Sequence, residues 1–238
     1  MKTLAIIQAR MESKRLPGKV MKNLSGKPVI EFLLSRLRKS KLIDEIIVAL
    51  PENDNNLVLK NHLINIGCSI FTGSEDDVLN RYYEAAKSVK AQNIVRITGD
   101  CPLIDPDIVD QVIQFYYESN VDYVSNISPP TYPDGLDVEV FSFNSLSIAE
   151  NECCNKDERE HVTSYIIDNK KFTNKNYKND IDYSNLRWTL DEPEDYQLLN
   201  EVCNNFKNEY FTWHDAINFF KTNNQLEYIN AMHIRNEG

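Results

Sequence analysis

Cysteine pairs spaced for a metal site, clustered histidines and long apolar runs are lacking in this chain of 238 residues. Its five cysteines include no Cys-x-x-Cys pair, and its four histidines are scattered along the chain. An odd number of cysteines with this spacing argues against a disulfide framework and against a zinc site. No stretch approaches the roughly 20 consecutive apolar residues that a membrane span requires. We therefore expect stability to come from a hydrophobic core alone.

The N-terminal segment lacks the apolar core of a signal peptide, because it enters a strand-like run at once. Acidic residues outnumber basic residues by 36 to 26, which gives a net charge of −10. Excess negative charge opposes general binding to nucleic acid or to an anionic membrane. We expect a cytoplasmic protein whose partners include neither nucleic acid nor a membrane.

The length and the 42% hydrophobic content indicate one domain with a sizeable core. The chain contains no internal repeat and no low-complexity linker. A Pro- and Gly-containing stretch at 128–135 interrupts its regular pattern. We expect a single domain over 1–238, with a core at 1–127, an insertion at 128–185 and a return to the core at 186–238.

The order of apolar patterns predicts an α/β fold. Short apolar runs predict strands over 3–7, 45–50, 69–71, 93–98, 121–125, 137–143 and 186–190. Helical spacing predicts helices over 30–37, 57–66, 78–89, 109–116, 159–168, 193–205 and 212–223, the last beginning with a capping box at Thr212 and Asp215. This alternation predicts a mainly parallel sheet with helices on both faces.

The polar loop after the first strand is the most informative segment. It contains Arg10, Arg15 and Lys19, the last two within Arg-Leu-Pro-Gly-Lys. Ligands of open α/β sheets bind beyond the carboxyl ends of the strands, where these cations would surround a polyphosphate. The spacing of a P-loop is absent. On charge alone, a solvated basic loop is the alternative.

A second polar loop, Thr-Gly-Asp-Cys-Pro-Leu-Ile-Asp over 98–105, follows a later strand. Asp100 directly after that strand would point into the same crevice, where a carboxylate suits Mg²⁺. Gly99 allows a ligand to approach the backbone closely. A turn-forming or helix-capping role for Asp100 is the alternative.

These loops, in this order, resemble the cytidylyltransferases that activate acidic sugars. That family includes 3-deoxy-manno-octulosonate and N-acylneuraminate cytidylyltransferases and a branch involved in spore-coat polysaccharide. The similar segments are 6–10, 15–19, 73–83, 98–105, 132–141, 159–163 and 190–195. The resemblance implies the Rossmann-like, three-layer nucleotide-diphospho-sugar transferase fold. It also implies transfer of CMP from CTP to an acidic sugar in surface polysaccharide or glycoconjugate biosynthesis, with release of pyrophosphate.

The resemblance implies roles for particular residues. The catalytic residues would be Arg10, Arg15, Lys19 and Asp100. The nucleotide-binding residues would be Ala9, Arg10, Met11, Ser13, Arg15, Lys19, Ser74, Arg81, Thr98 and Gly99. Asp100 and Asp191 would hold Mg²⁺, for which Mn²⁺ is a possible substitute. The acceptor-binding residues would be Asp137, Arg159, His161 and Arg187.

Several of these residues have plainer explanations. Asp191 suits the N-terminus of a helix, and Arg81 follows Asp77 at the i+4 spacing of a surface ion pair. Arg159 and His161 would also fit a charged helix face. The octulosonate enzymes have an arginine shortly before their Ser-Gly-Thr-Glu-Arg segment, and Phe71-Thr-Gly-Ser74 offers none, so base selection is left open.

The expected partners are CTP, a small acidic acceptor and a second copy of the chain. The resemblance suggests a homodimer built through the insertion, because an exposed strand edge there invites pairing. A phosphate, phosphonate or other non-sugar acceptor is the nearest alternative. A metal-dependent glycosyltransferase and a nucleotide-binding protein without turnover are two further alternatives.

Overall fold

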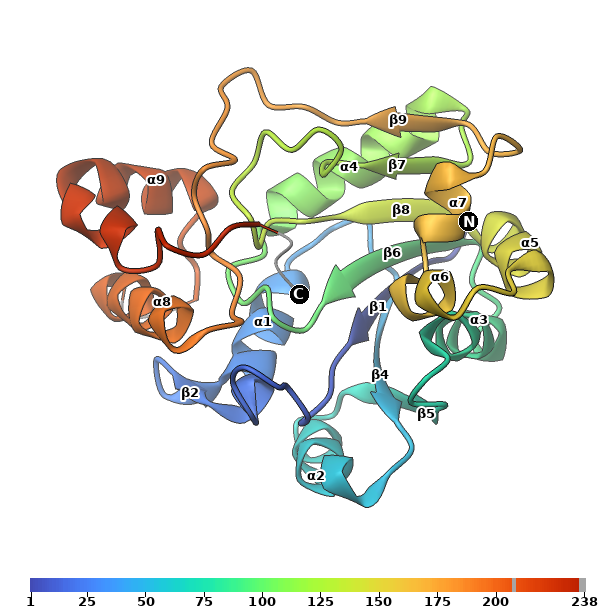
Figure 1. Cartoon of the computed structure of the whole chain (residues 1–238), viewed down its shortest axis with the longest axis horizontal. Helices are drawn as coiled ribbons and strands as arrows, with labels where there is room; N and C mark the ends of the chain where they lie inside the picture. Colours follow the sequence, from blue (N-terminus) through green and yellow to red (C-terminus); the bar gives the residue numbers. More distant parts are fainter. Residues whose placement is uncertain (207–208, 236–238) are drawn as a thin grey trace.

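A seven-stranded sheet runs through the centre of the computed structural model, which describes residues 1–206 and 209–235 (Figure 1). Its strand order is β5-β4-β1-β6-β8-β7-β9. The strands are β1 (Thr3–Gln8), β4 (Glu45–Pro51), β5 (Ser69–Gly73), β6 (Asn93–Thr98), β7 (Tyr123–Ser125), β8 (Glu139–Ser142) and β9 (Asn174–Asn176). Strands β5, β4, β1 and β6 are parallel, and β8 is antiparallel to both of its neighbours. The mainly parallel α/β fold expected from the sequence is confirmed.

Helices cover both faces of this sheet. They are α1 (Val29–Leu37), α2 (Leu57–Asn65), α3 (Val78–Ser88), α4 (Pro106–Ser119), α5 (Phe143–Glu152), α6 (Lys156–His161), α7 (Ser164–Asp168), α8 (Pro193–Phe206) and α9 (Trp213–Thr222). Alternate residues of β1 enter two separate cores. Ala5 and Ile7 join the core with α1, α4, α8 and α9, whereas Leu4 and Ile6 join the core with α3 and α5. The period of two along a strand therefore produces the three layers.

Local signals in the sequence account for several helix boundaries. Thr212 and Asp215 form the expected capping box at the start of α9. Asp105 accepts hydrogen bonds from the backbone of residues 107 and 108, and Pro106 takes the first position of α4, where a missing N–H costs nothing. The short antiparallel pair β2 (Asn23–Leu24) and β3 (Lys27–Pro28) leads into α1.

The prediction of a strand over 186–190 is wrong. This segment makes only an isolated parallel bridge between Arg187 and Asp134, and it runs past the end of the sheet. Its residues are buried, which explains why they resemble a strand in sequence. Leu190 N donates to Asp100 O at 2.8 Å, so the segment lies beside the loop after β6. Gly135 lets the loop before β8 approach the backbone of this segment, because a Cβ there would lie 2.6 Å from the Trp188 carbonyl carbon.

The helix expected over 159–168 is interrupted. It divides into α6 and α7 at Val162, whose φ of 64° is incompatible with a continuous helix. The strand expected over 137–143 is β8, and it lies inside the sheet, between β6 and β7. The edge strand on this side of the sheet is β9. Within residues 1–206 and 209–235, no helix has the length and apolar character needed to cross a membrane.

Candidate active site

The loops after β1 and β6 meet because these two parallel strands are direct neighbours. Gln8 pairs with Thr98 at their carboxyl ends, and Gly99 N donates to Gln8 O at 2.9 Å. A Cβ on Gly99 would lie only 2.8 Å from that carbonyl oxygen. Glycine is therefore required for the close approach that places Asp100 beside the loop after β1.

The loop after β1 is folded back on itself, which turns Lys19 toward Asp100. Gly18 N donates to Met11 O at 2.9 Å, and Gly18 has the left-handed φ of 68°. Met11 N donates to the Asn56 side chain at 2.9 Å, which ties this loop to the segment after β4. Lys19 then begins a short 3₁₀ helix, Lys19–Met21.

Buried Arg36 holds the loop after β6 in place by hydrogen bonds to its backbone. Its Nε donates to Ile104 O at 2.8 Å, and its guanidinium also donates to Phe211 O at 2.9 Å. Burial lowers the pKa of Arg36, although the charge of Asp105 opposes that effect. These bonds satisfy backbone carbonyls in a loop that contributes to the site.

Lys19 lies between two carboxylates from distant parts of the chain. Its Nζ is 2.8 Å from Asp100 Oδ2 and 2.7 Å from Asp191 Oδ1. Burial by itself raises the pKa of Asp100, but the charge and hydrogen bond of Lys19 outweigh it and the pKa falls to about 2. Burial likewise lowers the pKa of Lys19, and the two carboxylates more than reverse that effect. Lys19 and Asp100 therefore stay charged at neutral pH.

Arg15 extends this cluster toward solvent. One terminal nitrogen lies 3.2 Å from Asp191 Oδ1, and its Nε lies 3.3 Å from Glu192 Oε1. Its side chain is 36% exposed, compared with 13% for Lys19. Arg15 therefore forms the outer rim of the cluster and Lys19 its floor.

Asp100 and Asp191 converge on a single cation, which suits a divalent metal. Magnesium commonly takes one or two protein carboxylates and completes its shell with water and substrate phosphate oxygens. Among the described residues, no group of three or more His, Cys, Asp or Glu side chains forms a metal cluster. The donor set therefore fits a metal that is shared with a phosphorylated ligand.

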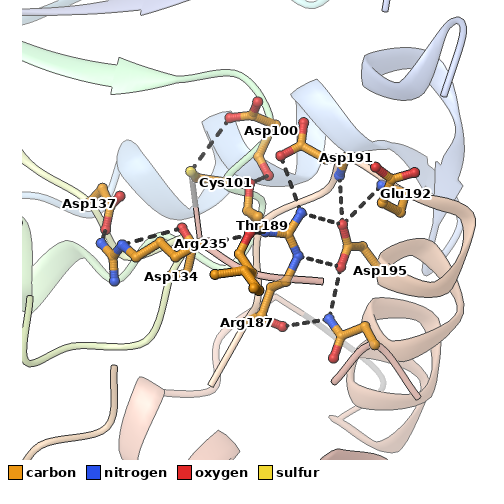
Figure 2. A network of polar contacts seen from close by, with 12 residues as sticks. Asp100, Cys101, Asp134, Asp137, Arg187, Thr189, Asp191, Glu192, Asp195 and Arg235 are labelled. Carbon is orange, nitrogen blue, oxygen red and sulfur yellow. Dashed lines mark hydrogen bonds and ion pairs between the residues drawn. The ribbon is translucent and has the colours of Figure 1, made fainter. Parts of the chain in front are cut away.

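A second network lies directly beneath Asp191 (Figure 2). Arg187 donates to both carboxylate oxygens of Asp195, at 2.9 and 3.0 Å, and to Asp134 at 3.3 Å. Asp195 also accepts from the backbone N–H groups of Asp191 and Glu192, each at 2.9 Å. These charge-assisted bonds fix the backbone that presents Asp191.

Comparison with known proteins agrees with this arrangement. A cytidylyltransferase family model matches residues 4–234. The chain belongs to the cytidylyltransferase family. It is 38% identical over 97% of its length to an uncharacterized protein of Methanocaldococcus jannaschii, covering 95% of that protein. It is 33% identical to the spore coat polysaccharide biosynthesis protein SpsF of Bacillus subtilis, over 84% of this chain and 85% of SpsF.

The fold comparison is equally extensive. A cytidylyltransferase of Leptospira borgpetersenii superimposes with a TM-score of 0.91 at 34% identity, covering 95% of this chain and 96% of that one. The chain is thus a CTP-dependent nucleotidyltransferase with the Rossmann-like fold that its motifs implied.

In this cytidylyltransferase, several residues expected near the nucleotide gather around the loop after β1. Arg81 is 4% exposed, and one terminal nitrogen donates to Ser74 O. Burial lowers the pKa of Arg81, and the nearby charge of Arg10 lowers it further. The ion pair between Arg81 and Asp77 considered from the sequence is replaced, since Asp77 pairs with Arg159 at 2.8 Å.

The remaining expected nucleotide residues lie in the same two loops. Ala9 is buried directly beneath Gly99, whereas Ser13 Oγ accepts from Leu16 N within the loop. Thr98 Oγ1 lies 3.1 Å from Cys101 Sγ. All three positions border Asp100 or the basic loop, and their contact with a nucleotide stays a prediction.

The cytidylyltransferase does not bring all four expected acceptor residues together. Asp137 and Arg187 belong to the network around Asp134. Arg159 instead joins α6 to α3 and α5, through Asp77 and through Glu150 at 2.6 Å. His161 is exposed at the end of α6. These contacts match the charged-helix explanation for Arg159.

One site residue has no signal in the sequence. Arg235 lies in a polar C-terminal segment without a recognisable motif, and it reaches Asp137 Oδ1 at 2.5 Å. Only the tertiary fold brings residue 235 next to residue 137.

Asp137 is a partly buried carboxyl group with an unusual affinity for protons. Burial raises the pKa of Asp137 to about 7, against the opposing charge of Arg235 and with help from the charge of Asp134. The folded protein therefore binds this proton more tightly than the unfolded chain does between pH 3.8 and about 7. Stability contributed by this group must fall as the pH rises through that window.

The Asp137→Asn variant tests this effect, because asparagine does not titrate and still offers an oxygen to Arg235. We expect the wild type to lose stability relative to the variant as the pH rises from about 4 to about 7, with no further change above that range. Urea unfolding of both proteins at several pH values measures the difference. A difference that stays constant across the window would contradict the assignment.

Proposed function

We propose that this cytidylyltransferase transfers CMP from CTP to an acidic sugar in surface polysaccharide biosynthesis. The observation that carries the proposal is the convergence of Asp100, Asp191, Lys19 and Arg15 at the carboxyl ends of the strands. The identity to SpsF supports a role in polysaccharide synthesis. The motif resemblance to the octulosonate and neuraminate enzymes supports an acidic acceptor.

In the proposed reaction, an oxygen of the acceptor attacks the α-phosphorus of CTP. The bond from the α-phosphorus to the bridging oxygen of the β-phosphate breaks, and pyrophosphate leaves. The acceptor hydroxyl gives up its proton to solvent water during the step. No covalent intermediate on the protein is needed, so the side chains act by positioning and by neutralising charge.

Asp100 and Asp191 would hold Mg²⁺ or Mn²⁺, which when bound neutralises phosphate charge and lowers the pKa of a coordinated hydroxyl. The charge balance of the site supports this role. The ion pairs join four cations to six carboxylates: Arg15, Lys19, Arg187 and Arg235 with Asp100, Asp134, Asp137, Asp191, Glu192 and Asp195. Acidic groups are in excess, which favours an additional cation.

Lys19 and Arg15 would bind the triphosphate. Lys19 Nζ has three hydrogens and holds two carboxylates, so it can exchange a carboxylate for a phosphate oxygen when the nucleotide arrives. Arg15 lies outside it and offers a planar donor set that matches phosphate oxygens. The two side chains would act on the leaving pyrophosphate.

The proposed reaction is tested by pyrophosphate release with ATP, CTP, GTP or UTP and a panel of acidic sugars. We expect CTP-specific release with 3-deoxy-D-manno-octulosonate, an N-acylneuraminate or a related acid, abolished by EDTA and restored by Mg²⁺. Asp100→Asn should lower turnover by about 100-fold or more, while Asp107→Asn, an exposed carboxylate of the following helix, retains activity. Release with phosphate or phosphonate acceptors alone would redirect the proposal, and full activity in EDTA would remove the metal.

The phosphate contacts are tested by comparing CTP with CMP, which lacks the β- and γ-phosphates. Arg15→Ala and Lys19→Ala should each weaken CTP binding by about 10- to 150-fold and change CMP binding much less. The exposed neighbour Lys14→Ala is the matched control and should leave both affinities unchanged. Calorimetric titration at fixed Mg²⁺ and salt measures them. Equal losses for CTP and CMP would place these side chains near the base or the α-phosphate.

We also propose a homodimer that forms through the insertion at 128–185. The insertion contains β9, which lies at the open edge of the sheet and presents unpaired backbone groups. Light scattering at micromolar concentration should report twice the chain mass of 27.6 kDa. Asn174→Pro in β9 removes a backbone N–H that points away from β7 and should shift the protein toward the monomer, whereas Lys170→Pro outside the strand should not. A wild-type monomer would refute the dimer.

A further inference from the structure

The C-terminal segment 230–235 forms one wall of the active site. Asn230 Nδ2 donates to Arg187 O at 2.9 Å and to Asp195 Oδ1 at 2.8 Å. His233 Nε2 lies 3.2 Å from Glu194 Oε2 at the start of α8. Figure 1 shows the C-terminal segment returning to the centre of the molecule. The segment is therefore held against the network that supports Asp191, and its last described residue is Arg235.

Arg235 is turned into the site (Figure 2). One terminal nitrogen lies 2.5 Å from Asp137 Oδ1, and the other donates to Tyr132 O at 3.3 Å. Its Nε is 4.0 Å from Asp134 Oδ1, which is too far for a hydrogen bond. The side chain is 14% exposed. Toward the part of the chain that the structure describes, Arg235 thus keeps donor capacity in a position that is largely shielded from water.

The two arginines expected from the sequence to bind the acceptor, Arg159 and Arg187, are occupied. All three guanidinium nitrogens of Arg187 make hydrogen bonds, to Asp134, Asp191, Asp195 and Ile234 O. Arg159 likewise donates hydrogen bonds to Asp77, to Glu150 and to two backbone carbonyls, on the side of the sheet with α3 and α5. Neither can bind a ligand without breaking several buried or partly buried hydrogen bonds.

Arg235 lies on the side of the site where the carboxylates are more exposed. Asp100 and Asp137 have the more exposed carboxylates, 24% and 29%, and buried Cys101 lies between them. Burial raises the pKa of the Cys101 thiol, with help first from the charge of Asp100 and then from that of Asp137. A ligand that approaches Asp100 along this face meets Asp137 and Arg235 at its far end.

We propose that Arg235 binds the carboxylate of the acceptor and thereby selects acidic acceptors. The inference rests on the proposed transfer of CMP to an acidic sugar. Asp137 and Asp134 hold the guanidinium in place in the absence of the acceptor. Because Asp137 takes up a proton more readily than an ordinary aspartate, its countercharge is incomplete near neutral pH, which leaves Arg235 able to attract an anion.

The test compares an acid with its uncharged carboxamide in wild type and variant. The probes are 3-deoxy-D-manno-octulosonate and N-acetylneuraminate, each beside its carboxamide, with pyrophosphate release as the readout. We expect the wild type to prefer the acid in kcat/KM by about 10- to 150-fold, the value of a charge-assisted hydrogen bond. Arg235→Gln should reduce that preference to less than about threefold through the acceptor KM, with the KM for CTP unchanged.

Two further variants separate binding from support of the fold. Arg235→Lys keeps the charge and should retain part of the preference for the acid. Lys221→Gln, an exposed cation of α9, should retain all of it. A purely structural role for Arg235 would lower kcat/KM for acid and amide equally in Arg235→Gln and leave the preference intact, which would overturn the proposal.

Failure of the proposed function has a different signature. If the wild type releases pyrophosphate with none of the acids, the acidic acceptor is refuted and the role of Arg235 with it. If the wild type uses an acid and Arg235→Gln keeps the wild-type preference, only the role of Arg235 is refuted. Thermal unfolding of each variant checks that the comparison is made on folded protein.

Discussion

The contact of Lys19 with Asp100 and Asp191 is the interaction on which the active site depends. It joins the loop after β1, the loop after β6 and the segment before α8, which are separated by 81 and 172 residues in sequence. Lys19 and Asp100 stay charged in a partly buried position because each lies beside an opposite charge. Losing Lys19 would take from Asp100 the cation that lowers its pKa, which is costly for a partly buried carboxylate. Two converging carboxylates are also a donor set that suits the proposed divalent cation.

The hydrogen-bond network of Arg187 supports the backbone that presents Asp191 to this contact. Asp195 is fully buried, yet both of its oxygens are satisfied by Arg187, by Asn230 and by two backbone N–H groups. Hydrogen bonding of this completeness is what makes a buried ionised carboxylate tolerable. Through it, the C-terminal segment, the segment before α8 and Asp134 form one connected support. Asp191 lies on the rim of that support, where its side chain is only partly covered.

The loops after β1 and β6 illustrate why part of the candidate site was visible in sequence. Polar residues that directly follow buried strands of a parallel sheet must gather at one edge, so Arg15, Lys19 and Asp100 could be placed near one another before the fold was known. The role of Arg159 stayed open in the sequence because a charged helix residue carries no information about the direction it faces. Residues 186–190 resemble a strand in sequence because burial gives an irregular segment the same apolar composition as a strand.

The sequence alone determined the layers, the parallel centre of the sheet and the identity of the two chemical loops, because these follow from local periodicity and from motifs of consecutive residues. Strand β6 agrees with its expected bounds, and the capping box of α9 is as expected. Only the tertiary structure decided that β8 lies inside the sheet, that Asp77 pairs with Arg159 and that Arg235 faces Asp137. Each of these depends on which distant segments are packed together. Packing depends on the burial of whole elements, and the spacing of neighbouring residues carries no information about it.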